Sequence, residues 1–268
     1  MLKKNLLLSL TLVTLSCKSQ DNQIFKINEQ YKSTNFNSRI RQIILHYTAG
    51  DFERSLKTLD GDTKRQVSSH YLINNILTKE YNCFIYNIVP DNLRSWHAGV
   101  SEWGQDDDLN NSSIGIEIVN IDGNKNAYPE KQIEAVIFLV KQLIKKYDVL
   151  PINIVGHSDI APTRKIDPGT QFPWKKLYDN SIGAWYDDKD IENFSNKITQ
   201  LPTIITIKSY LNRYGYKINL TNPNIDEEYR DVVKAFQRHF SPKKIDGEMS
   251  LENYIILRSL LKKYRSIN

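Results

Sequence analysis

The chain is poor in cysteine, which limits covalent cross-linking. Its 268 residues contain two cysteines, Cys17 and Cys83. Cys17 lies in the N-terminal segment, so a single cysteine is left for the rest of the chain, and it has no partner for an internal disulfide. Cys83 lies inside the strand-like stretch NCFIYNIV, and we predict that it is buried.

A dense stripe of basic side chains is also missing. The net charge is +5, and the lysines and arginines are spread along the chain or occur in pairs such as Lys262 and Lys263. We therefore expect no nucleic-acid partner. With 40% hydrophobic and 25% charged residues, the chain has the composition of an ordinary globular protein, and we expect a monomer. Its length suits one medium domain and one small domain.

Residues 1–17 have the pattern of an export signal. Lys3 and Lys4 precede NLLLSLTLVTLS, an apolar run too short to span a membrane stably. The sequence TLSC resembles a bacterial lipoprotein box in which Cys17 is lipidated, although Thr14 replaces the usual leucine. We expect an exported lipoprotein of the cell envelope, held at the (outer) membrane by its lipid. An ordinary cleaved signal is the alternative.

From about residue 38 the pattern predicts an α/β (α+β) domain, which we place at 24–185. The stretch 113–121 alternates, so that Ile114, Ile116 and Ile118 share one face and Glu117 lies on the other. We expect a central mixed sheet flanked by helices. The predicted strands are 40–47, 67–74, 83–89, 113–121 and 152–156, and the predicted helices are 51–59, 129–147 and a short one near 172–178.

The C-terminal part has a different pattern. A polar stretch at 186–202 ends in a proline and predicts a linker. Three short helices follow, at 203–215, 226–240 and 250–264, each with one apolar stripe. We predict that residues 203–268 form a small helical module that could fold alone and that serves binding, not catalysis. The alternative is that the module packs on the catalytic domain and lines its cleft.

One loop, GHSDIAPTRKIDPG at 156–169, concentrates side chains that could do chemistry. His157 follows the apolar strand INIV, and His46 ends the first predicted strand. Two histidines at strand ends and one loop carboxylate would give a metal three protein ligands, and zinc would keep a fourth position for water. A single histidine of this kind is usually an ordinary core or surface residue, so spacing alone leaves the site open.

Five ordered motifs carry a closer resemblance: IILHYTAG, SSHYLI, WHAGVSEWG, LNNSSIGIEIVN and GHSDIAPTRKIDPG. Together they resemble the zinc-dependent N-acetylmuramoyl-L-alanine amidases of the amidase type 2 family, which is related to the peptidoglycan recognition proteins. The resemblance covers residues 38–185. In the tail, YLNRYGYKI, VVKAFQRHF and IDGEMS resemble the peptidoglycan-binding type 1 module, over a shorter and looser match.

The resemblance implies a zinc cofactor held by His46, His157 and Asp167. It implies that Glu117 is the general acid and base, and that Lys165 stabilises the negative charge on the carbonyl oxygen. The implied reaction cleaves the amide between the lactyl group of N-acetylmuramic acid and L-alanine of the stem peptide. Zinc lowers the pKa of bound water from ~15.7 to about 7, which makes hydroxide available at neutral pH.

Other motif residues receive weaker assignments. The resemblance implies that several side chains contact substrate near the cleft. Two of them have an equally plausible structural role: Trp96 could pack its own loop, and Arg164 could be a solvated loop arginine. His70 is expected to pack within the sheet, Asp159 to stiffen its loop, and His239 to have no catalytic part. The candidate substrate-binding residues are Trp96, His97, Asn111 and Arg164.

Three other functions compete with this interpretation. Two histidines and a carboxylate also describe non-haem iron oxygenases, although those usually bring one histidine and the carboxylate close together on a strand. A non-catalytic peptidoglycan recognition protein could share the fold, but such proteins have typically lost a zinc ligand. An enzyme of the same fold could also cut a different amide. We predict the muramoyl amidase, with peptidoglycan or muropeptides as its partner.

Overall fold

The computed structural model describes residues 27, 30–61, 64 and 66–267. The predicted signal segment, with Cys17, lies outside these residues. Among the described residues, those from 38 onward cluster into one compact unit, and those before 38 belong to a separate one. Within the described part of the chain, no helix has both the length and the apolar character needed to cross a membrane.

A five-stranded mixed sheet lies at the centre of the larger unit. The strand order is β3-β2-β4-β1-β5. Strand β1 runs parallel to both β4 and β5, β2 runs parallel to β4, and β3 pairs antiparallel with β2. The predicted mixed sheet is therefore confirmed. The strands are β1 (Gln42–Tyr47), β2 (Tyr71–Ile73), β3 (Ile85–Asn87), β4 (Ser113–Ile118) and β5 (Ile154–Gly156).

Helices surround the sheet and form most of the C-terminal part. Several begin with a side-chain cap: Asp51, Thr203, Asp226 and Ser250 each accept a hydrogen bond from a backbone N–H of the first turn. The helices are α1 (Phe52–Leu59), α2 (Leu109–Ser112), α3 (Glu130–Tyr147), α4 (His157–Ile160), α5 (Trp174–Asp179), α6 (Asp188–Ser195), α7 (Ile204–Tyr214), α8 (Glu227–Phe240) and α9 (Leu251–Arg265), with a short 3₁₀ turn, η1 (Pro151–Asn153).

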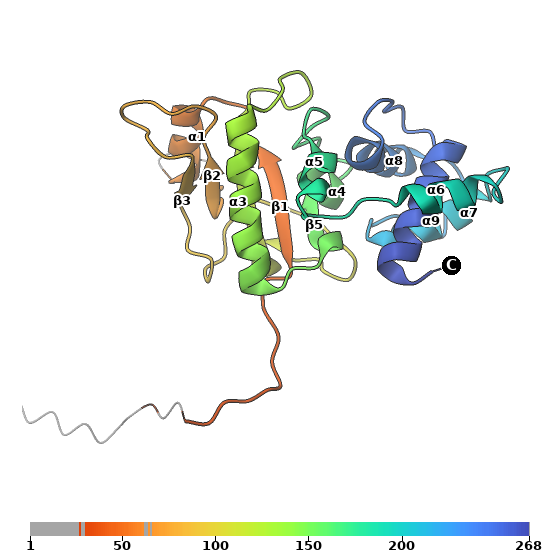
Figure 1. Ribbon diagram of the computed structural model, residues 1–268, viewed down its shortest axis with the longest axis horizontal. Coiled ribbons are helices and arrows are strands. Elements are labelled where there is room, and N and C mark those ends of the chain that lie inside the picture. Colours follow the sequence, from red (N-terminus) through yellow and green to blue (C-terminus); the bar gives the residue numbers. More distant parts are fainter. Residues whose placement is uncertain (1–26, 28–29, 62–63, 65, 268) are drawn as a thin grey trace, which may run out of the picture. The chain divides into compact units, whose positions relative to one another are not determined.

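Successive side chains of β4 point to opposite faces of the sheet, so its isoleucines enter the core and Glu117 lies on the other face. Its three isoleucines are fully buried and belong to the same hydrophobic cluster as Ile133 and Val136 of α3. Helix α3 lies along the sheet in Figure 1. Its buried Gln132 donates from Nε2 to the carbonyl oxygens of Ile73 and Val119, which fixes the helix to the ends of β2 and β4. The face of β4 that carries Glu117 is thereby left for chemistry.

The C-terminal helices share this core. The Trp103 ring meets the Tyr216 ring edge-on, with ring centroids 5.0 Å apart. The ring centroids of Trp185 and Phe240 are 5.8 Å apart. Gly215, at the end of α7, has φ +156°, and a Cβ there would lie 2.7 Å from the Trp103 ring. A side chain at this position would collide with the Trp103 ring, and the ring would have to shift. The predicted module and the predicted catalytic domain therefore lie in one packed core.

Some details of the prediction are wrong. The stretch at 186–202, predicted as a linker with no helix of its own assigned, contains α6, which packs against α9. The predicted strands at 67–74 and 83–89 shorten to β2 and β3, since only three residues of each pair across the two strands. Cys83 is exposed because β3 is an edge strand that begins at Ile85, which leaves the cysteine in the preceding loop.

Candidate metal centre and active site

The carboxyl ends of neighbouring strands bring the predicted ligands together. His46 is the fifth residue of β1, and Leu45 beside it pairs with Gly156 of β5. Helix α4 begins directly after β5 with His157. The loop then returns, because the backbone N–H of Ser158 donates to the carbonyl oxygen of Asp167 at 2.8 Å. Parallel pairing thus places both histidines at the carboxyl edge of the sheet, where these strands end, and the loop adds the carboxylate.

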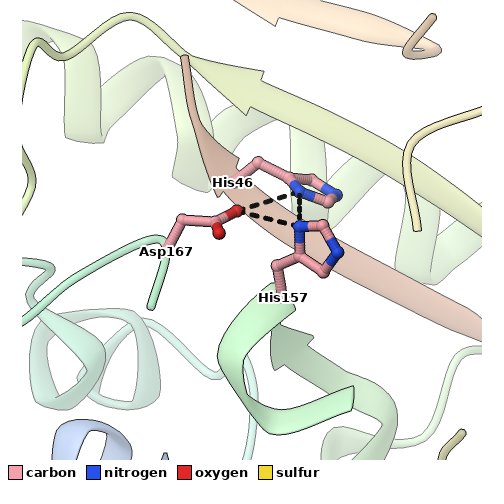
Figure 2. Close-up of side chains that lie close together, drawn as sticks. All are labelled: His46, His157 and Asp167. Atoms are coloured by element: carbon pink, nitrogen blue, oxygen red, sulfur yellow. Dashed lines mark hydrogen bonds and ion pairs between the residues drawn. The ribbon is translucent and has the colours of Figure 1, made fainter. Parts of the chain in front are cut away.

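Three donor atoms converge at this edge, as Figure 2 shows. His46 Nδ1 lies 2.9 Å from His157 Nδ1, and each nitrogen lies 3.1 Å from Asp167 Oδ2. The side chains are buried, with exposed fractions of 1% for His46, 3% for His157 and 9% for Asp167. Among the described residues, they form the group of histidine and acidic side chains whose donor atoms could hold a metal ion.

This geometry fits a zinc ion. Two ligands at about 2.0–2.1 Å from a tetrahedral ion lie about 3.3 Å from one another, close to the separations found here. Nitrogen and oxygen donors of this kind are ligands that zinc accepts, and three of them leave one position open. Without a cation, two ring nitrogens facing each other at 2.9 Å can share at most one proton between them.

The local electrostatics also favour a cation over protons. Burial lowers the pKa of His46 to about 4, helped by His157 and opposed by Asp167, so its imidazole is neutral at pH 7. Burial would raise the pKa of Asp167, but the two histidines outweigh it and hold that pKa below its ordinary range. A neutral His46 imidazole and an ionised Asp167 carboxylate are the protonation states that metal binding requires of these two groups.

The outer nitrogens of both histidines are also bonded. His157 Nε2–H donates to the carbonyl oxygen of Ala98 at 3.0 Å. His46 Nε2 lies 3.0 Å from His97 Nδ1, and His97 Nε2 lies 3.2 Å from Ser113 Oγ. With Nδ1 of each ligand facing the metal position, Nε2 carries the proton and donates. Such outer bonds fix the tautomer and the ring orientation of a metal ligand.

Gly115 is the residue that makes room for this support. It lies on the same face of β4 as Glu117, two residues away. A Cβ at Gly115 would lie 2.4 Å from Cγ of the His97 ring. The close approach of His97 therefore requires the glycine in SIGIEIV, and no pattern in the sequence predicts this contact.

Glu117 faces a cavity beside the three ligands. It pairs directly with His46 across β4 and β1, so the two side chains point to the same side of the sheet. Its Oε2 is buried and has no hydrogen-bond partner among the described residues. Burial raises the pKa of Glu117 to about 8, with Asp167 adding to the rise and Lys165 opposing it. The cavity measures about 420 Å³ and is lined by residues that include Trp96, His97, Glu117, His157, Arg164, Lys165 and Asp167.

The candidate substrate-binding residues differ in their placement. Trp96 is 52% exposed at the cavity, with the Arg94 guanidinium 4.4 Å from its ring centre. His97 lines the cavity but is mostly buried, with its Nδ1 on His46. The Arg164 guanidinium is also at the cavity, where it donates to the carbonyl oxygens of Ala98 and Val100 and so holds the neighbouring loop.

Asn111 is not among the residues that line the cavity. It belongs to α2, at the start of β4, whereas Glu117 lies near the other end of that strand. Its backbone oxygen accepts a hydrogen bond from Arg39. The preceding residue, Asn110, is the one that supports the site, because its Oδ1 accepts the N–H groups of His97 and Ala98 at 3.0 and 2.8 Å. Two adjacent asparagines do not reveal from sequence alone which of them points inward.

The raised pKa of Glu117 predicts a pH dependence of stability in metal-free protein. Between pH 4.5, the ordinary pKa, and about 8, the folded state keeps a proton that the unfolded state releases. The free energy of unfolding should therefore fall as pH rises through this window. Glu117→Gln should remove that part of the slope, as measured by urea unfolding in chelator. Glu53→Gln, on the exposed side of α1, is the matched control. Equal slopes in Glu117→Gln and wild-type protein would contradict the prediction.

Two family models match the chain. The model described as N-acetylmuramoyl-L-alanine amidase matches residues 36–170, and a model for a peptidoglycan binding domain matches residues 200–252. The first match contains the three convergent ligands and Glu117, and the second contains α7 and α8.

One curated relative is similar over most of the chain, and another over about a third of it. The N-acetylmuramoyl-L-alanine amidase AmiD of Escherichia coli is 40% identical over 238 residues, which is 84% of each protein. The 1,6-anhydro-N-acetylmuramyl-L-alanine amidase AmpD of Enterobacter cloacae is 40% identical over 94 residues, 35% of this chain and 49% of the relative, so the match spans about half of AmpD.

Solved structures agree with these matches. The complex of Escherichia coli AmiD with an anhydro-N-acetylmuramic acid peptide has a TM-score of 0.80 at 36% identity, covering 91% of this chain and 97% of that one. AmpDh3 of Pseudomonas aeruginosa, in complex with anhydromuramic pentapeptide, has a TM-score of 0.79 at 38% identity, covering 90% and 98%. The chain belongs to the N-acetylmuramoyl-L-alanine amidase family.

Proposed function

We propose that this protein hydrolyses the amide between the lactyl group of N-acetylmuramic acid and L-alanine of the peptidoglycan stem peptide. One observation carries the proposal: two imidazole nitrogens and a carboxylate oxygen converge beside a cavity that a second acidic residue, Glu117, also faces. Hydrolysis of an amide needs an activated water, a proton acceptor and stabilisation of the carbonyl oxygen. The residues around this cavity can meet each of these needs.

His46, His157 and Asp167 would hold zinc, which when bound supplies a Lewis acid and a water that is acidic enough to ionise near pH 7. Glu117 takes the proton from the attacking water and returns it to the departing amine of L-alanine. Its buried position and raised pKa suit a group that must both accept and release a proton near neutral pH. The Lys165 ammonium, at the same cavity, stabilises negative charge on the carbonyl oxygen.

The substrate class we propose is a muropeptide, with anhydromuramic ends accepted. The two related structures contain anhydromuramic peptides, which supports this assignment. Trp96 is the predicted contact best placed to meet the sugar or peptide, because its large apolar ring is exposed at the cavity. Arg164 also reaches the cavity, and its bonds to the loop carbonyls give it a positioning role alongside any contact with substrate.

Mass spectrometry of muropeptides incubated with the protein tests this function. We expect a free stem peptide and the corresponding muramic acid product, with turnover lost when a chelator removes the metal. Glu117→Gln should lower turnover by ~10²–10⁴ and keep the zinc content, since Glu117 lies outside the ligand group. Glu53→Gln should behave as wild type.

Two results would contradict the proposal. Intact muropeptides after incubation with a zinc-loaded protein that binds them would indicate a recognition protein. Cleavage at a different amide, visible as other product masses, would place the chain with an enzyme of another specificity.

We also propose that the protein is exported and held at a membrane of the cell envelope by a lipid on Cys17. The lysines, the short apolar run and the TLSC motif support this anchor. In cell fractionation, wild-type protein and Cys83→Ser should sediment with membranes, whereas Cys17→Ser should move to the soluble fraction. Membrane association of Cys17→Ser would rule the lipid anchor out.

For the C-terminal helices we propose a second contact with the wall polymer, separate from the cavity. Docking there would raise the effective concentration of substrate at the site. Full-length Glu117→Gln should co-sediment with insoluble sacculi even when soluble muropeptide saturates the cavity. Complete release by the soluble muropeptide would mean that the cavity alone holds the polymer.

A further inference from the structure

Asp159 is a buried carboxylate that the proposed reaction does not use. It lies in α4, two residues after His157, and is 1% exposed. It is not part of the group of ligands, which takes its carboxylate from Asp167. A buried carboxylate is costly unless hydrogen bonds satisfy its oxygens. The hydrogen-bond partners of Asp159 therefore indicate its structural role.

One partner is the backbone just before a metal ligand. Asp159 Oδ2 accepts the N–H of Gly156 at 2.8 Å. This bond closes the first turn of α4 and fixes the direction in which the chain enters His157. Gly156 itself has little freedom, since a Cβ there would lie 2.6 Å from Pro168 Cδ, next to Asp167.

The other two partners come from the C-terminal part: Tyr216 follows α7, and His239 lies in α8. The Tyr216 hydroxyl donates to Asp159 Oδ1 at 2.7 Å. His239 Nδ1–H donates to Asp159 Oδ2 at 2.8 Å. Both side chains are buried, with exposed fractions of 0% for Tyr216 and 3% for His239. The C-terminal part thus supplies two of the three hydrogen bonds that hold this carboxylate.

Aromatic packing keeps these two donors in place. The His239 ring stacks on Trp174 of α5 with centroids 3.8 Å apart, and Phe240 lies 4.0 Å away with a nearly parallel ring. The Tyr216 ring meets Trp103 edge-on. Each donor is therefore oriented before it bonds, as a group that positions another residue should be.

We propose that Tyr216 and His239 are positioning residues of the metal centre. They hold Asp159, Asp159 holds the turn that begins α4, and that turn sets the position of His157 Nδ1 against His46 and Asp167. The C-terminal helices are on this account a structural part of the zinc site as well as a wall-binding element. The inference rests on the proposed zinc site but not on the identity of the amide that is cut.

Zinc affinity in three full-length variants tests the inference. Tyr216→Phe and His239→Phe each remove one donor and keep an aromatic ring for packing, and the double variant removes both. Zinc dissociation constants come from competition with a chelator, and the absorption spectrum of the cobalt-substituted protein reports the ligand geometry. The double variant should bind zinc ~10–100-fold more weakly and show an altered cobalt spectrum. Tyr229→Phe, a buried tyrosine of α8, is the control and should match wild type.

Folded Tyr216→Phe and His239→Phe proteins with the zinc affinity and cobalt spectrum of wild type would overturn the inference, even if they melt at lower temperature. That pattern would mean that the two residues only stabilise the fold. If the double variant does not fold, the single variants decide by the same two measurements. A wild-type protein that binds no zinc would instead refute the metal site of the proposed function.

Discussion

The structure depends on bringing three electron-pair donors to within about 3 Å of one another in a buried place. Two imidazole nitrogens and one carboxylate oxygen meet at separations of 2.9 to 3.1 Å. Burial lowers the pKa of His46, so a proton binds only weakly between these three donors at neutral pH. A divalent cation satisfies all three donors at once, and much of the surrounding structure keeps them aligned for it.

The sheet supplies most of that alignment. Parallel pairing of β1 with β4 sets His46 beside Glu117, and pairing of β1 with β5 delivers the chain to His157. The distance between a metal ligand and the proton carrier is thus fixed by strand register, because a slip of one residue would turn Glu117 into the core. The loop that brings in Asp167 is in turn held at Gly156 by Asp159, which Tyr216 and His239 of the C-terminal part support.

Local patterns in the sequence predicted the helices and strands whose formation depends on residues close together in the chain. Alternation in 113–121 and the apolar stripe of 129–147 predicted β4, the buried isoleucines and α3. The ligands His46, His157 and Asp167 came from the family motifs, since histidine spacing alone could not select them. Hydrogen bonds between distant segments were not predicted. Asn110 accepts the backbone N–H groups of residues 97 and 98, and Tyr216 and His239 donate to Asp159. Such pairs leave no periodic signal, because each partner has an ordinary local sequence.

X-ray absorption spectroscopy at the zinc edge tests the central claim most directly, since it reports the atoms around the metal without reference to activity. The account predicts two imidazole nitrogens at about 2.0–2.1 Å with the remaining donors oxygen. A spectrum with three imidazoles would place His97 on the metal and contradict its role as support for His46. A sulfur neighbour at about 2.3 Å would contradict the site altogether.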